Sequence, residues 1–154
     1  MFVFTLLVPL MRAAEITPLE APETVIATLV RALGNANSPA PNAGVYKAYQ
    51  LASPANRLVA GPYGRFLRIV KVPQFASLLH PDPDSVQFGS IEIDSNHAQQ
   101  TVALRSQGQS SAFLITLTRQ ASGPSQGVWL VDGVAPLVAS QGKARKAIPA
   151  SAVR

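Results

Sequence analysis

The spacing of apolar residues changes at Pro81-Asp82-Pro83. Before this point apolar side chains recur every third or fourth residue, and after it they alternate with polar ones. The first period is typical of a helix with one buried face, and the second of a strand with one buried face. A chain with helices first and strands afterwards is expected to fold as an α+β domain, because both kinds of element must share one core.

The most regular helical pattern begins at Pro22. Its apolar side chains share one face: Val25, Ile26, Leu29, Val30 and Leu33. Proline suits the first turn of a helix and glycine its end, so we expect a helix from Pro22 that stops at Gly34. Its apolar face is expected to lie in the core of the domain rather than to bind a partner.

Proline divides the next part of the chain into short helices. We expect a helix over Val45–Leu51, then one that Ser53 caps and Pro54 begins, then one over Pro62–Val72. Pro73 is expected to end this last helix, because proline cannot continue a helix that precedes it.

Four strands are expected after Pro83, at about residues 86–93, 101–106, 113–118 and 128–134. Short turns join them, with residues 96–99 and 107–111 as the first two, so they predict an antiparallel meander. In the first strand the apolar parity changes at Gly89-Ser90, which predicts a β-bulge there. Such a bulge bends a sheet, so the expected fold is a curved, cone-shaped sheet with helices packed on one face.

The chain divides into three parts on this basis. Residues 22–136 form one domain, preceded by an apolar, targeting-like segment and linker at 1–21 and followed by a basic, disordered tail at 137–154. The apolar run Phe2–Leu10 is too short to span a membrane, which takes about 20 residues. It resembles the apolar part of an export or lumen-targeting signal, with a membrane-touching arm or a misplaced start codon as alternatives.

Composition excludes several kinds of chemistry. The chain has no cysteine, so disulfides, thiolate metal sites and cysteine nucleophiles are excluded. Only two histidines are present, His80 and His97, and we expect no metal site and no cofactor. Aromatic residues are few and do not alternate with basic ones, so binding of nucleic acid is not expected.

Charge is unevenly distributed. The formal charge of +5 falls to +1 over residues 1–137, because four of the basic residues lie in the tail. Between Thr24 and Pro81 there are six basic residues and no acidic one, so the helical half is expected to be positive. This surface is either a solvated face or a binding surface for an acidic partner or an anionic ligand.

Two motifs suggest a family. Ala48-Tyr49-Gln50-Leu51-Ala52-Ser53-Pro54-Ala55-Asn56-Arg57 is followed by Gly61-Pro62 and Arg65-Phe66, and the late stretch Trp129–Val134 fits as well. Over about Pro22–Val134 the chain resembles the nuclear-transport-factor-2-like superfamily, also called the cystatin-like cone. Within it the chain is most similar to the uncharacterised domain-of-unknown-function 4864 family. The resemblance implies a fold and no particular activity. Similar sequences occur in bacteria and in plastid-bearing organisms, so a plastid is the suspected location of this protein.

Asp132 is the one candidate catalytic residue. A carboxylate that points into a cone-shaped cavity can act as a general base, and enzymes of the resembled superfamily often pair one with a tyrosine or histidine. Partners of these types are available in the helical half: Tyr46, Tyr49, Tyr63 and His80. The alternative is a structural aspartate in a turn or in a salt bridge.

The candidate residues for binding a ligand or partner are Arg57, Arg65, Arg68, Tyr49 and Trp129. Arg57 could present its guanidinium to a carboxylate or phosphate, or it could tie a helix to the sheet, with Asp132 as its partner. Asn56 would then cap a helix or brace a loop.

These observations favour a non-catalytic binding or assembly module. It would form a homodimer through the open sheet face or hold an apolar ligand in the cone. An exposed face of Phe113, Ile115 and Leu117 would favour the homodimer, and the same side chains in a closed cavity would favour the ligand. One alternative is a small acid–base enzyme with Asp132 in the pocket. A second is an adaptor that binds an acidic protein through Arg57, Arg65, Arg68 and Lys71.

Overall fold

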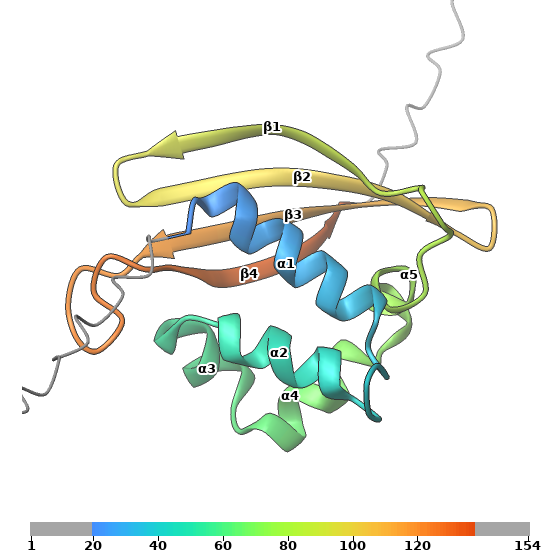
Figure 1. Ribbon diagram of the computed structural model, residues 1–154, viewed down its shortest axis with the longest axis horizontal. Helices are drawn as coiled ribbons and strands as arrows, with labels where there is room; N and C mark the ends of the chain where they lie inside the picture. Colours follow the sequence, from blue (N-terminus) through green and yellow to red (C-terminus); the bar gives the residue numbers. More distant parts are fainter. Residues whose placement is uncertain (1–19, 138–154) are drawn as a thin grey trace, which may run out of the picture.

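The computed structural model describes residues 20–137 (Figure 1). The expected targeting segment, up to residue 19, and the expected basic tail, from residue 138, lie outside the described residues. Within them, helices precede strands, as the change of period predicts. The fold is α+β, with helices packed on a four-stranded antiparallel sheet.

The helical half contains the four expected helices, followed by two short helical elements. Its elements are α1 (Pro22–Gly34), α2 (Ala43–Leu51), α3 (Pro54–Ala60), α4 (Tyr63–Val70), the 3-10 helix η1 (Pro73–Phe75) and α5 (Ala76–Leu79). Proline begins α1, α3 and η1. Helix α4 ends before Pro73, as expected, and Pro73 then starts a further turn that leads into α5 and buries Leu78, which was not predicted. None of the described helices has the length and apolar character to cross a membrane.

The strands form the expected meander in the order β1-β2-β3-β4. They are β1 (Gln87–Asp94), β2 (His97–Ser106), β3 (Gln109–Arg119) and β4 (Trp129–Leu137). The turns at 96–99 and 107–111 were predicted too long, because Ser95-Asn96 and Gln107-Gly108 make tight two-residue turns. Ser95, Gln107 and Gly108 reach φ values between 52° and 75° there, as such turns require.

Two β-bulges bend the sheet. The register between β1 and β2 shifts between Phe88 and Ile91, which confirms the bulge expected at Gly89-Ser90. A second shift was not predicted: Thr116 pairs with Gly133 and Leu117 with Val131, so Asp132 has no partner on β3. An extra residue of this kind twists the strand and redirects its side chain.

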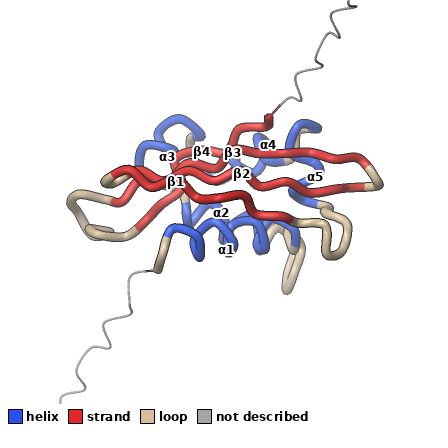
Figure 2. Tube along the Cα trace, turned by 90° about the horizontal axis from the view of Figure 1, so that it is seen from above, coloured by secondary structure: helices blue, strands red, loops and turns tan. Residues whose placement is uncertain are grey.

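Helix α1 lies across the inner face of the sheet (Figure 1). Seen from above, the four strands run side by side along the long axis of the domain, over the helices (Figure 2). Each of β2, β3 and β4 contributes alternate side chains to the core: Val102, Leu104, Phe113, Ile115, Leu117, Trp129 and Val131. Burial of this face stabilises the fold, since each fully buried aliphatic or aromatic side chain contributes about 1.5–3 kcal/mol.

Phe113, Ile115 and Leu117 do not form the exposed face that would favour a homodimer. Each is at most 1% exposed, so this apolar face is covered by the chain's own helices and cannot be a dimer surface. The side chains that alternate with them, such as Thr116 and Thr118, face outward and are half-buried. The outer face of the sheet therefore carries polar side chains together with Leu114 and Leu130, and no helix of residues 20–137 covers it.

Candidate ligand-binding site

The Ser53-Pro54-Ala55-Asn56 sequence attaches α3 to the edge of the sheet. Ser53 caps the helix, since its Oγ accepts a hydrogen bond from the Asn56 backbone N–H at 3.1 Å. The backbone carbonyl of Val131 in β4 accepts two further bonds, from the Ser53 N–H at 2.8 Å and from the Asn56 side-chain amide at 3.0 Å. These bonds cover the free edge of β4 and set the position of α3 beside it.

A pocket of about 380 Å³ lies between the helices and β4, and we call it the helix–sheet pocket. Its volume is within the range of small-molecule sites. Its walls come from α1–α5, η1 and β4, and they are mainly apolar: Phe66, Ile69, Phe75, Leu78, Val131 and Val134 are among them. An arrangement of this kind can hold an apolar molecule away from water.

The rim of the helix–sheet pocket is formed by α3 and α4. Val59 lines the pocket and is 79% exposed, and Arg65 lines it from the first turns of α4, also exposed. Gly61 has a φ of 78°, and a Cβ there would lie 3.0 Å from the Cδ of Arg65. Glycine at this position therefore makes the sharp turn between the helices and leaves room for the Arg65 side chain.

Arg57 does not bind Asp132, contrary to one of the expectations for it. Its guanidinium donates a hydrogen bond to the Gln50 carbonyl at 2.9 Å and lies 5.0 Å from the centre of the Tyr49 ring. Tyr49 itself packs against Tyr63 and Phe66. Asn56, not Arg57, ties the helix to the sheet, and Arg57 with Tyr49 braces α2 against α3.

The other candidate binding residues do not come together at the helix–sheet pocket. Trp129 is 8% exposed in the core and does not line the helix–sheet pocket. Arg68 and Lys71 are exposed but lie outside the pocket wall. Of the basic candidates, the fold brings Arg65 alone to the pocket.

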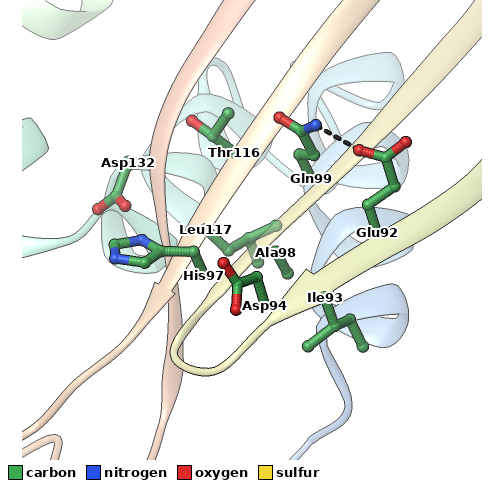
Figure 3. Close-up of a pocket in the computed structure, with 9 residues that line it drawn as sticks. All are labelled: Glu92, Ile93, Asp94, His97, Ala98, Gln99, Thr116, Leu117 and Asp132. Carbon is green, nitrogen blue, oxygen red and sulfur yellow. Dashed lines mark hydrogen bonds between the residues drawn. The ribbon is translucent and has the colours of Figure 1, made fainter.

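Asp132 directs its carboxylate to the outer face of the sheet. It lines an open depression there with Glu92, Asp94, His97 and Gln99, among others (Figure 3). Figure 3 shows Asp132 and His97 turned toward one another. The backbone around Asp132 also borders the helix–sheet pocket. The expected pairing of Asp132 with a tyrosine or with His80 does not occur, because those residues belong to the helical half.

Thr118 connects Asp132 with His97. Its hydroxyl donates a hydrogen bond to the Asp132 carboxylate and lies 3.2 Å from Nδ1 of His97. A hydroxyl has one proton, so the hydroxyl oxygen must accept from a protonated Nδ1. The result is a short polar chain on the outer face that runs from Asp132 through Thr118 to the exposed His97. Among residues 20–137 no group of three histidine or acidic side chains gathers closely enough to hold a metal ion.

The sequence did not predict which residues line the helix–sheet pocket, and it did not predict the polar chain of Asp132, Thr118 and His97. The wall of the helix–sheet pocket consists of residues that the helical period assigns to the core, and no local pattern marks them as a cavity. The contact of His97 with Thr118 depends on strand register, which pairs these two residues directly. In comparisons with known proteins, no family model, no curated protein and no solved structure matched this chain.

Proposed function

We propose that this domain is a non-catalytic module that binds a small apolar ligand in the helix–sheet pocket. The observation that carries the proposal is the pocket itself: an apolar space of about 380 Å³ whose rim includes the exposed side chain of Val59. An apolar ligand would cover wall and rim together. The association would gain from the removal of apolar surface from water.

Three observations bear on the alternatives to this proposal. The apolar sheet face that a homodimer would have used is buried beneath α1 and the other helices. The Asp132 carboxylate is hydrogen-bonded to Thr118 on the outer face, which weakens the case for an acid–base enzyme that works inside the pocket. An adaptor for acidic proteins would have to use Arg65, Arg68 and Lys71, because Arg57 is engaged with Gln50 and Tyr49.

We also propose membership of the nuclear-transport-factor-2-like superfamily. A long first helix across a bent antiparallel meander, with a pocket between helices and sheet, supports it. The Ser53–Arg57 segment, which carries the resemblance, includes the residues that hold α3 at the edge of β4. This proposal concerns the fold family and adds no activity.

Binding of a neutral fluorescent probe, 1-aminoanthracene, to the full-length chain tests the ligand-binding proposal. Ala60 lines the pocket and Ala55 lies exposed on the same helix, so Ala60→Leu and Ala55→Leu form a matched pair. We expect the probe to bind with enhanced fluorescence, Ala60→Leu to weaken it at least tenfold, and Ala55→Leu to leave it unchanged. Far-ultraviolet circular dichroism establishes that both variants are folded.

Absence of probe binding to the folded wild-type chain would overturn the proposal, and so would equal effects of the two leucine variants. Native mass spectrometry on protein purified gently from its source cells is an independent check. A mass excess of a few hundred daltons supports an occupied pocket. A bare dimer without an adduct, together with no probe binding, would favour the assembly role instead.

A further inference from the structure

We infer that the ligand of the helix–sheet pocket is an amphipathic anion, an apolar chain whose terminal carboxylate pairs with Arg65 at the rim. This inference rests on the proposed function and names the chemical class of the ligand. It is carried by the position of one uncommitted guanidinium at the edge of an otherwise apolar space.

Arg65 and Asp132 are the two charged residues that border the pocket. Asp132 is not available to a ligand inside it, because its carboxylate accepts the Thr118 hydroxyl on the outer face of the sheet. Within the described part of the chain the Arg65 guanidinium makes no hydrogen bond. By contrast, Arg57 donates to the Gln50 carbonyl, and Arg119 donates to the Gly127 carbonyl at 3.1 Å.

The Arg65 guanidinium therefore favours a ligand head group that accepts hydrogen bonds over one that donates them. A guanidinium has only donors, arranged as a planar fork that matches the two oxygens of a carboxylate. Asn56, the uncharged polar residue of the wall, uses one amide N–H in its bond to Val131. A ligand with a cationic or purely donating head group would leave Arg65 unpaired.

The electrostatic potential of the helical half also favours an anionic ligand. From Thr24 to Pro81 the chain has six basic residues and no acidic residue, and this segment forms most of α1, all of α2–α5 and most of the pocket wall. Glu23 is the one acidic residue of these helices. The summed potential of these charges attracts an anion and repels a cation before any contact is made. The acidic depression around Glu92 and Asp94 lies on the outer face of the sheet.

The volume sets the length of the ligand. At about 30 Å³ for each non-hydrogen group, the share that one water molecule takes in the liquid, the pocket accommodates about a dozen such groups. Decanoate has this size, with an alkyl chain for the apolar wall and a carboxylate for Arg65. Decanol and decylamine are matched probes of the same chain length with a neutral and a cationic head group.

Displacement of bound 1-aminoanthracene from the full-length chain tests the inference. We expect decanoate to compete about fivefold more strongly than decanol, since an ion pair at an exposed site has an effect of at most this order. Decylamine should compete most weakly of the three. Octanoate should compete about tenfold less strongly than decanoate, because it lacks two methylene groups.

Arg65→Gln and Arg68→Gln provide the matched variants, since both arginines are exposed on α4 and only Arg65 lines the pocket. Arg65→Gln should abolish the preference for decanoate over decanol and still bind the neutral probe. Arg68→Gln should retain the preference.

The outcomes separate the two proposals. Probe binding with equal competition by acid and alcohol, or a preference that survives in Arg65→Gln, overturns the anionic ligand and leaves the apolar pocket intact. A preference lost equally in Arg68→Gln also overturns it, because general positive charge would then explain the effect. Failure of the neutral probe to bind the wild-type chain overturns the proposed function, and the inference with it.

Discussion

Asn56, in the first turn of α3, donates its side-chain amide to the backbone carbonyl of Val131, which lies 75 residues further along the chain in β4. The Ser53 N–H donates to the same carbonyl. Val131 also lines the helix–sheet pocket, as do Val59 and Ala60 at the end of α3. The bond from Asn56 to Val131 therefore positions one wall of the pocket against another.

Replacement of Asn56 by alanine should lower the free energy of unfolding by about 1 kcal/mol, the usual net contribution of one hydrogen bond. Urea denaturation measures this change in the free energy of unfolding. Asn35→Ala is the matched control, because the Asn35 amide donates to the Arg31 carbonyl at an exposed site, where water can replace it. Equal destabilisation by the two variants would contradict a special role for the bond to Val131.

Gly44 and Gly64 should respond to alanine in opposite directions. A Cβ at Gly44 would lie 1.9 Å from the Ala32 carbonyl oxygen and 2.8 Å from that of Asn35, both backbone atoms. Gly44→Ala should therefore force α1 and α2 apart and destabilise the domain by about 3 kcal/mol or more. At Gly64, in α4, a Cβ would meet nothing within 4 Å. Gly64→Ala should raise the free energy of unfolding by about 0.5–1 kcal/mol. Thermal melts that rank the two variants otherwise would refute this packing.

Thr118→Val removes the hydroxyl between Asp132 and His97 while it keeps the branched shape of the side chain. We expect a loss of about 1 kcal/mol in the free energy of unfolding, since a half-buried carboxylate loses a donor. The side-chain ¹⁵N shifts of His97 should also change, because Nδ1 no longer has the hydroxyl oxygen as acceptor. Binding of the neutral probe should stay at the wild-type level, since Thr118 faces outward. A His97 spectrum identical to that of the wild type would show that no hydrogen bond joins Thr118 and His97.

Asp82 holds the turn between β2 and β3. Its two carboxylate oxygens accept the backbone N–H groups of Gln107, at 2.8 Å, and Gly108, at 3.1 Å. Asp82→Asn replaces one acceptor with a donor, so we expect a loss of about 1–2 kcal/mol in the free energy of unfolding. Asp84→Asn is the control, because Asp84 is exposed and its φ of 56° suits asparagine equally well. Urea midpoints for Asp82→Asn that match those of Asp84→Asn would contradict the role of the Asp82 carboxylate.

Several elements were predictable from the sequence because their causes are local. The apolar stripe from Val25 to Leu33 needs only the helical period, and the cap of α3 needs only Ser53 followed by Pro54. The bulge in β1 was visible as a change of parity around Gly89-Ser90, since side chains must alternate between the two faces of a strand. An antiparallel meander was the expected topology because short turns join the four strands.

The start of β2 at His97 was not predictable, because its first outward-facing residues are polar and look like part of a turn. The bulge at Asp132 depends on pairing between β3 and β4, which no local pattern records. It is this bulge that accompanies the outward direction of the Asp132 carboxylate, away from the tyrosines that seemed its natural partners.

By itself the sequence determined most of the helices and strands, which faces are apolar and where the positive charge lies, because period, capping and composition act over a few residues. The tertiary structure alone decided that Asn56 meets Val131, that Arg65 and not Arg57 reaches the pocket, and that Phe113, Ile115 and Leu117 are covered. These contacts join residues far apart in the chain, and they depend on how helices of given length pack on a sheet of given curvature. Packing at this level is a property of the assembled core, and no single segment contains it.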